Sequence, residues 1–409
     1  MRPFAAGVAA SGSERGLSGG GPRLASRLAV VAVARSIANM ESSTDTAGLT
    51  ERDLLTRRAA EMQGLISLAG GLPDPALFPK RELSRAFVSA LQSNAAAALQ
   101  YGWPEGAPEL RKEIAKELAA RGAEVAPERI IVTSGAQQAI QLAVSLVGSR
   151  PRIGVESETY AGALEIFRSA RARLVSLEES AQLYYVMPAV SNPRGQTMPT
   201  AQRRAVLDRA RASRGYVIED DAYQAIHFSD PRASPMLASH PERVFHVGTY
   251  SKTLCPGLRI GWLVPPRKLA RQALRQKQAL DLQANGMTQA LLVEYLQSGH
   301  LEGLQRRACA RYRRKLRRLL DAVKRELPQF TCTPPVGGFS LWLESDLALD
   351  DQRLLELAVS EGVSFDVGQP FRARPSAKLA IRLCYSAVPE ADIASGVARI
   401  ARAVRRARR

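Results

Sequence analysis

With 409 residues, of which 45% are hydrophobic, the chain can bury a large core in one big domain and a smaller one, which excludes a repeat protein or a disordered one. The net charge of +18 is scattered over predicted helices and not gathered in one arm, so we interpret it as a solvated basic surface and expect no nucleic-acid partner. Four cysteines without CxxC spacing, and four histidines without metal-ligand spacing, predict free thiols in a reducing cytoplasm and no metal site.

Residues 1–39 differ in composition from the rest of the chain. They are rich in Gly, Ala, Ser and Arg and contain a single acid, Glu14, so we expect a disordered leader. Their apolar run Leu28–Val33 is far shorter than the about 20 residues that cross a bilayer, and we expect no membrane partner. The leader resembles an organellar transit peptide. It equally resembles upstream sequence ahead of a true initiator at Met40, the interpretation that we favour.

Globular patterning begins near Leu49. A short helix is predicted over Arg52–Met62, and a Gly/Pro-rich strand and loop over Ile66–Pro79, where paired glycines let the backbone lie against a ligand. A helix is predicted over Lys80–Gln92. The segment Tyr101–Arg111, YGWPEGAPELR, follows.

The next 140 residues or so alternate strands and helices, which predicts a parallel sheet with helices on both faces. A tight turn at Ser134–Gln137 opens a helix over Gln138–Val147, and such a turn directs free N–H groups toward an anion. The same turn ends many ordinary strands. The predicted strands are Ile130–Thr133, Ile153–Ser157, Leu183–Met187 and Tyr216–Glu219.

Two aspartates, Asp220 and Asp221, follow the last of these strands. A carboxylate at the carboxyl end of a buried parallel strand lies where α/β proteins bind ligands, and it needs a partner in order to stay ionised there. The alternative is that both residues only cap a helix.

The segment Gly248–Trp262, GTYSKTLCPGLRIGW, carries the clearest chemical signal. Lys252 lies between small hydroxyl residues, and Arg259 follows seven positions later beyond a Pro-Gly break. An amine that attacks a carbonyl must lose its proton and so needs a desolvated site, while an arginine near a turn suits a phosphate. Only 9 of the 57 basic residues are lysines, so a lysine retained here suggests an amine that must be deprotonated. An ordinary solvated lysine remains the alternative.

The C-terminal part begins with a helix predicted over Leu301–Leu327, where apolar residues recur at steps of three and four. Its opposite face is rich in arginine without interleaved aromatic residues, so we interpret it as solvated. A strand at Gly337–Glu344, a helix at Asp351–Glu361 and a strand at Leu379–Tyr385 follow, and a last helix ends the chain. Arg382 is the single charge within the last strand and needs an anionic partner.

The pattern S-K-x-x-x-P-G-x-R-x-G-W resembles the Schiff-base segment of fold-type I pyridoxal-phosphate enzymes, and most closely that of the class I/II aminotransferases, the group of the 2-aminoadipate and kynurenine enzymes. Other blocks match the same family in order between about residues 65 and 386: LAGGLPDPxLFP, Y-G-x-x-x-G-x-x-x-L-R, Asn-Pro-x-Gly and Asp-x-x-Tyr. The resemblance implies an α/β fold. It would have a large domain with a mostly parallel sheet flanked by helices, and a smaller α+β domain from both chain ends. We expect an arm at 40–85, the cofactor domain at 86–295 and the small domain at 296–409.

The resemblance also implies a site for pyridoxal 5'-phosphate. Lys252 would carry the cofactor as an internal aldimine, and Asp220 would keep the pyridine nitrogen protonated. Backbone N–H groups at Ala136 and Gln137 would bind the phosphate together with Arg259. Ala136 stands where serine is commoner, so a hydroxyl contact is lost. The remaining cofactor contacts would be Tyr160 on the ring face, Asn192 and Tyr223 at the phenolic oxygen, and the hydroxyls of Thr249 and Ser251.

For the substrate, the resemblance implies that Arg382 binds the α-carboxylate, with Gly71 and Asn192 also in contact. Tyr101 would reach the phosphate of a neighbouring subunit, which implies a homodimer with shared active sites. The expected function is amino-group transfer between an α-amino acid and a 2-oxo acid, and we favour apolar or aromatic amino acids. A lyase, decarboxylase or racemase of the same fold would share these residues. A transcriptional regulator with an aminotransferase-like domain would need a winged-helix domain before the Gly70 block.

Overall fold

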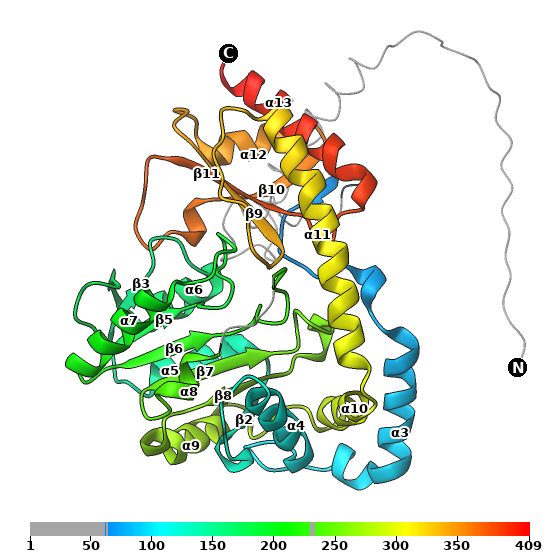
Figure 1. Ribbon diagram of the computed structural model, residues 1–409, viewed down its shortest axis with the longest axis vertical. Helices are drawn as coiled ribbons and strands as arrows, with labels where there is room; N and C mark the ends of the chain where they lie inside the picture. Colours follow the sequence, from blue (N-terminus) through cyan, green and yellow to red (C-terminus); the bar gives the residue numbers. More distant parts are fainter. Residues whose placement is uncertain (1–61, 63, 230–233) are drawn as a thin grey trace, which may run out of the picture. The chain divides into compact units, whose positions relative to one another are not determined.

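A computed structural model describes residues 62, 64–229 and 234–409. The leader predicted at 1–39 and the helix predicted over Arg52–Met62 lie outside these residues, except for Met62 itself. The described chain contains two β-sheets with helices packed around them (Figure 1).

The larger sheet has seven strands in the order β2-β8-β7-β6-β5-β3-β4. Strand β8 is antiparallel to its neighbours β2 and β7, while all other neighbours pair in parallel. The central strands β5 and β7 are mostly apolar and buried along their whole length, as expected for a sheet covered on both faces. The strands are β2 Ile131–Thr133, β3 Arg152–Val155, β4 Arg173–Ser176, β5 Leu183–Val186, β6 Tyr216–Asp220, β7 Val244–Thr249 and β8 Gly261–Val264.

Helices cover this sheet. Helix α5, Ala136–Ser145, packs on β6, β7 and β8, and α7, Thr200–Ala212, packs on β5 and β6. The buried stripe of α5 follows the helical period, since Ala139, Ile140 and Ala143 are all inaccessible. The other helices of this part are α3 Lys80–Leu99, α4 Pro108–Ala119, α6 Ala161–Ser169, α8 Met236–Ser239, α9 Ala270–Asp281 and α10 Gly286–Gln297.

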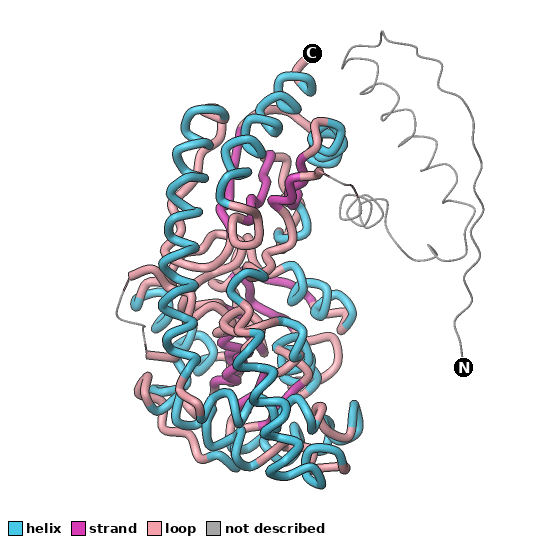
Figure 2. Tube along the Cα trace, turned by 90° about the vertical axis from the view of Figure 1, so that its right-hand side faces the viewer, coloured by secondary structure: helices cyan, strands magenta, loops and turns pink. Residues whose placement is uncertain are grey.

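The smaller sheet has four strands in the order β1-β10-β11-β9. Strand β1, Ile66–Leu68, comes from the N-terminal side and pairs in parallel with β10, Val363–Val367. Strands β11, Leu379–Cys384, and β9, Ser340–Ser345, continue the sheet in antiparallel pairing. Helices α12, Asp351–Ser360, and α13, Ile393–Ala407, pack on it. Figure 2 shows the strands of the two sheets as separate groups. The expected mostly parallel sheet with a second α+β part is confirmed.

Helix α11, His300–Glu326, runs from α10 to α13 (Figure 1). Its predicted apolar stripe is buried. The interpretation of its arginine face as merely solvated is wrong for Arg311, because Arg311 Nε donates to the buried Asp74 at 2.6 Å.

Several element boundaries differ from the prediction by a few residues, and that of α3 differs most. Helix α3 continues to Leu99, past the predicted end at Gln92, because the alanines that follow favour helix. Helix α5 begins at Ala136, so the predicted turn is shorter by two residues. Within the described ranges, no helix is long and apolar enough to cross a membrane, and no group of acidic, histidine and cysteine side chains could hold a metal ion.

Candidate active site

A cavity of about 230 Å³ lies at the carboxyl ends of β5, β6 and β7, where residues of the smaller sheet also reach it. Every residue predicted to bind cofactor or substrate lines this cavity, except Tyr101. The lining residues are Gly70, Gly71, Ala136, Gln137, Tyr160, Ala161, Met187, Asn192, Asp220, Ala222, Tyr223, Thr249, Ser251, Lys252, Pro256, Arg259, Phe371 and Arg382.

Lys252 lies in the turn that follows β7, and its side chain is half-buried. Its Nζ donates to the carbonyl oxygen of Gly71 at 3.1 Å. Burial, with the positive charge of Arg382 adding to it, lowers the pKa of Lys252 to about 8. Part of the population therefore carries a free amine near neutral pH, which is the state that a nucleophile or a general base requires.

Asp220 ends β6 and is buried. Burial raises the pKa of its carboxyl group to about 6, although hydrogen bonds oppose the shift. The hydroxyl of Tyr185 donates to Oδ2 at 2.6 Å, and the N–H of Ala222 donates to Oδ1 at 3.2 Å. A positively charged partner in the cavity would stabilise the ionised form, so the position fits a protonated ring nitrogen.

Asp221 faces away from the cavity, which separates the roles of the two aspartates. Its Oδ2 pairs with Arg121 and lies 3.1 Å from Nε2 of His246, and all three side chains are buried. Burial alone would raise the pKa of Asp221, but Arg121 and His246 lower it. The alternative that both aspartates only cap a helix is wrong, because turns follow β6 and no helix begins there.

The start of helix α5 also lines the cavity, with Ala136 and Gln137. Gly135, with φ 89°, precedes α5, so the N–H groups of Ala136 and Gln137 belong to the first turn, which has no acceptor within the helix. A Cβ on Gly135 would collide with the Arg259 guanidinium, and a Cβ on Gly261 would lie 2.7 Å from the carbonyl carbon of Gly135. We call this space the cradle: neither glycine has a side chain that would fill it, and free N–H groups at a helix start suit a small anion.

The guanidinium of Arg259 lies beside this cradle, next to Gly135. It ends the 3-10 turn Pro256–Leu258 in the left-handed conformation, with φ 53°, and its Nη2 donates to the carbonyl oxygen of Ser134 at 3.1 Å. The hydroxyl of Thr249 donates to Ile260 O at 2.7 Å and accepts from the N–H of Ser251 at 3.1 Å. Thr249 therefore orients Ser251, and the set of donors fits a phosphate group.

Arg382 and Asn192 lie on the side of the cavity near the smaller sheet. Both are buried, and Nη1 of Arg382 donates to Oδ1 of Asn192 at 2.8 Å. Because Oδ1 accepts this bond, the amide nitrogen of Asn192 remains as a donor. The Phe371 ring lies 4.3 Å from the guanidinium carbon. From the sequence we expect the substrate to be the anionic partner that the buried Arg382 needs. That expectation needs correction, because Asp366 already pairs with Arg382 at 2.7 Å.

Sequence reasoning missed Asp366, Tyr185 and Phe371. Asp366 is an acid within the apolar strand VSFDV. A charge in an apolar strand needs a partner, and this reasoning, which identified Arg382, applies equally to Asp366. Tyr185 and Phe371 carry no such signal, since a tyrosine in the strand LYYV or a phenylalanine in the turn QPF is ordinary core composition.

Tyr101 lies outside this cavity and is 78% exposed. Its neighbour Trp103 is 72% exposed, and Leu99 is 69% exposed. Both aromatic residues line a separate cavity of about 610 Å³ between α3 and α10. The described part of one chain therefore presents a cluster of uncovered apolar side chains here, of a kind that marks interaction surfaces.

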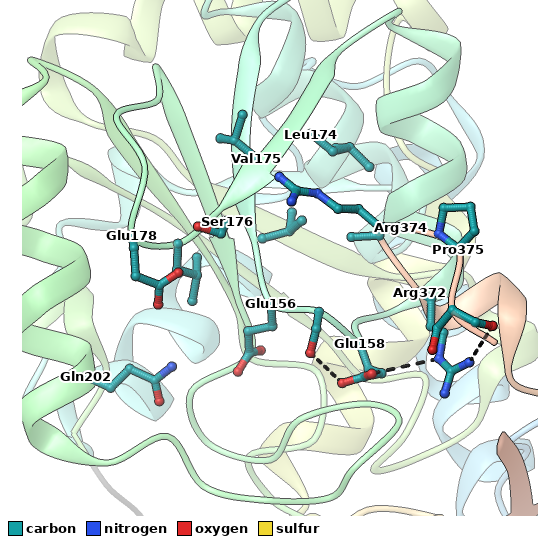
Figure 3. Close-up of a pocket in the computed structure, with 15 residues that line it drawn as sticks. Glu156, Glu158, Leu174, Val175, Ser176, Glu178, Gln202, Arg372, Arg374 and Pro375 are labelled. Carbon is teal, nitrogen blue, oxygen red and sulfur yellow. Dashed lines mark hydrogen bonds and ion pairs between the residues drawn. The ribbon is translucent and has the colours of Figure 1, made fainter. Parts of the chain in front are cut away.

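Another cavity, of about 540 Å³, lies between the ends of β3 and β4 and residues 372–376. Figure 3 shows Glu158 linked to Arg372, at 3.9 Å. Glu158 also pairs with Arg194, and Arg374 pairs with Glu179. None of the residues lining this cavity is a lysine, so the chemistry of an unprotonated amine belongs to the smaller cavity around Lys252.

Comparison with known proteins places this geometry in context. The family model described as aminotransferase class I and II matches residues 77–400. The 2-aminoadipate transaminase of Thermus thermophilus is 32% identical over 381 residues, which cover 87% of this chain and 94% of that protein. Aromatic-amino-acid aminotransferase 1 of Thermococcus litoralis is also 32% identical, over 87% of this chain and 91% of that protein. The crystal structure of Pyrococcus horikoshii kynurenine aminotransferase, solved with PMP, has a TM-score of 0.82 and 29% identity, covering 89% of this chain and 96% of that one.

Proposed function

This chain belongs to the aminotransferase class I and II family, and we propose how its own residues carry out the reaction of that family. It is a pyridoxal-phosphate-dependent aminotransferase that transfers an amino group between an amino acid and a 2-oxo acid. When bound, the cofactor supplies a protonated ring that accepts the electron pair left behind when the Cα proton is removed.

The residues around the cavity fit this cofactor. We assign the phosphate to the cradle of Ala136, Gln137 and Arg259, with the Ser251 hydroxyl as a further donor, because these groups converge where Gly135 and Gly261 keep space open. The buried carboxylate of Asp220 has only uncharged hydrogen-bond donors among the described residues, the Tyr185 hydroxyl and the Ala222 N–H, which supports placing the ring nitrogen beside it. Tyr160 would then lie against the ring face. Tyr223 and the free amide nitrogen of Asn192 would donate to the phenolic oxygen.

Lys252 is the catalytic residue of the proposal. Its Nζ, with a pKa of about 8, would form the covalent link to the cofactor and, once an amino acid has displaced it, take the proton from the substrate Cα. The same amine would return the proton to the adjoining cofactor carbon. Gly71 O supports this role because it holds Nζ in the cavity at 3.1 Å.

Arg382 would bind the α-carboxylate of the substrate, with Asn192 and Gly71 as neighbours. For the side chain we propose apolar or aromatic amino acids. Phe371 and Met187 line the cavity, and its only lining cations among the described residues are Lys252, Arg259 and Arg382, each of which already has a task. The names of the relatives include a dicarboxylic amino acid and aromatic amino acids. The choice of apolar or aromatic substrates therefore rests on the cations that line the cavity, none of which is left for a second carboxylate.

We also propose that the enzyme is a homodimer with shared sites, in which Tyr101 reaches the cofactor phosphate of the partner subunit. The exposed Tyr101, Trp103 and Leu99 support an interface. The proposed compartment is the reducing cytoplasm, in keeping with four cysteines that are all free: Cys255, Cys309, Cys332 and Cys384.

The observation that carries the proposal is the convergence of Lys252, Asp220 and the phosphate cradle on one cavity. The test adds amino acids one at a time to the cofactor-loaded enzyme and follows the visible absorbance while the released product is identified. Loss of the visible band with stoichiometric 2-oxo acid supports transfer. Release of carbon dioxide, or racemised amino acid without oxo acid, would overturn it in favour of a lyase, decarboxylase or racemase reaction.

A further inference from the structure

Asp366 lies behind the substrate-binding arginine rather than in the cavity. It belongs to β10 and stands directly opposite Arg382 in the antiparallel register with β11. Its side chain is 22% exposed and that of Arg382 is 8% exposed. Asp366 is absent from the cavity lining, whereas Arg382 is part of it. A carboxylate in this position contacts the guanidinium from the side away from the substrate.

A single oxygen of Asp366 accepts hydrogen bonds from three N–H groups. Its Oδ2 accepts from Arg382 Nε at 3.0 Å, from Arg382 Nη2 at 2.7 Å and from the N–H of Gly70 at 3.0 Å. The other oxygen, Oδ1, accepts from Gly70 alone among the described residues, at 3.2 Å. The thiol of Cys384 also lies 3.4 Å from Oδ2. Asp366 thus joins the guanidinium to the Gly70–Phe78 loop.

Counting the guanidinium donors shows what this arrangement leaves free. A guanidinium has five N–H groups. Asp366 takes the Nε–H and one N–H of Nη2, and Asn192 takes one N–H of Nη1 at 2.8 Å. One N–H remains on each terminal nitrogen, and the edge that joins Nη1 and Nη2 lies toward Gly71, since a Cβ on Gly71 would be 3.7 Å from Nη1 and 3.6 Å from Nη2. That edge has the spacing of a bidentate carboxylate partner.

We propose that Asp366 is a positioning residue that holds Arg382 by its Nε edge and so presents the opposite edge to the substrate α-carboxylate. The inference rests on the proposed function and deepens it. The same carboxylate fixes Gly70, and the neighbouring Gly71 carbonyl holds Lys252 Nζ at 3.1 Å. Asp366 therefore aligns the group that binds the substrate with the loop that holds the amine.

The test compares three variants with the wild type in the half-reaction with the amino acid that the wild type converts fastest. Asp366→Ala removes the acceptor, and Asp366→Asn keeps one oxygen, which in the place of Oδ2 retains all three N–H donors. Ser364→Ala is the matched control, since Ser364 lies two residues away on β10 and its hydroxyl bonds only to Ser67 among the described residues. The concentration of amino acid for half-maximal rate, the limiting rate and the cofactor content are measured for each.

Asp366→Ala should raise the half-saturating concentration about ten-fold or more, the size expected for lost hydrogen bonds to a charged group, with a smaller change in the limiting rate and full cofactor content. In Asp366→Asn the half-saturating concentration should lie within about three-fold of the wild-type value. Ser364→Ala should match the wild type. Three results would overturn the proposal: an unchanged or lowered concentration in Asp366→Ala, no recovery in Asp366→Asn, or the same rise in Ser364→Ala. A wild type that converts no amino acid would instead refute the proposed function.

Discussion

Lys252 and Asp220 show how one physical cause prepares two different groups. Burial disfavours charge, so it lowers the pKa of the amine to about 8 and raises that of the carboxyl group to about 6. Lys252, which is partly unprotonated near neutral pH, and Asp220, whose carboxylate a cation would stabilise, thus line the same cavity. Opposite shifts within one cavity are typical of catalytic sites.

The shift at Lys252 predicts the pH dependence of cofactor loading. Only the neutral amine attacks an aldehyde, so below pH 8 the rate of reconstitution of cofactor-free protein should rise about ten-fold per pH unit and then level off. Stopped-flow absorbance after addition of pyridoxal phosphate measures this rate. A rate that keeps rising toward pH 10 would show a lysine with an ordinary pKa.

The shift also predicts a stability effect, whose sign follows from its direction. The pKa of Lys252 is lower in the folded state, so the fold is most stable above the unfolded pKa of lysine, where the amine is neutral in both states. This stability is lost as the pH falls through about 8, because the folded state must then hold a charged amine in a buried position. Lys252→Met should therefore raise the melting temperature of the cofactor-free protein at pH 6 and leave it nearly unchanged at pH 11. An equal effect at both pH values would contradict the burial of the amine.

Arg382→Ala should raise the amino acid concentration needed for half-maximal rate by orders of magnitude, since breaking a buried charge pair costs about 3–5 kcal/mol. The absorbance of the bound cofactor should stay as in the wild type, because the phosphate cradle is untouched. Steady-state kinetics and a spectrum of each variant give both readings. Equal kinetics in the variant would exclude Arg382 as the carboxylate site.

At this scale the sequence located the groups with a chemical motif but not the groups that orient them. Lys252, Asp220 and Arg382 stood out because an amine, an acid or a guanidinium in an apolar setting requires a reason. Tyr185 and Asp366 act on these groups across strands, and such pairings depend on sheet register, which a single strand does not reveal.

At the scale of elements, helix α11 holds the Gly70–Phe78 loop through a buried ion cluster. Asp74 accepts from Lys315 Nζ at 2.7 Å and from Arg311 Nε at 2.6 Å, and its own N–H donates to the hydroxyl of Tyr312 at 3.0 Å. Lys315 Nζ also donates to the carbonyl oxygen of Ser386 at 2.6 Å. Burial alone would raise the pKa of Asp74, but the hydrogen bonds from Lys315 and Arg311 outweigh it and lower the pKa.

Asp74→Asn should lower the free energy of unfolding by about 3 kcal/mol, because it leaves Lys315 buried without a counter-charge. Since the pKa of Asp74 is lowered in the fold, the stabilisation is present above the unfolded pKa and is lost as the pH falls. Urea denaturation at pH 7 measures it. The control Glu302→Gln removes an exposed pair with Arg306 on the same helix and should cost less than about 1 kcal/mol. Equal losses in both variants would contradict the account.

The periodic elements were the most predictable. The apolar stripe predicted for α11 follows the helical step so closely that the structure buries it from Leu304 onward. Element ends were less predictable, because α3 and α5 extend past turn signals through residues that favour helix. The role of Arg311 was hidden for another reason: its partner Asp74 lies 237 positions away in the sequence.

At the scale of the molecule, the exposed cluster of Leu99, Tyr101 and Trp103 predicts assembly. Sedimentation should show a homodimer, and Trp103→Glu should shift it toward monomer because a charge would be buried at the interface. Tyr101→Phe should keep the dimer but weaken cofactor retention, since only the hydroxyl is lost. A wild-type monomer with full activity would refute the shared site.

The sequence predicted the fold class but not the order of the strands. Alternating strands and helices indicated a mostly parallel sheet, and the family motifs indicated a second part built from both chain ends. The insertion of antiparallel β8 between β2 and β7 could not be deduced from local patterns, because strand order depends on contacts between distant residues.

The central claim is that the Lys252 amine holds the cofactor. Borohydride reduction of the loaded enzyme, followed by proteolysis and mass spectrometry, tests it most directly. The predicted result is one cofactor adduct per chain, on the peptide that contains Lys252, and no adduct in Lys252→Arg, because a guanidinium cannot be deprotonated in a protein. An adduct on any of the other eight lysines, or no adduct on a chain that has bound the cofactor, would contradict the account.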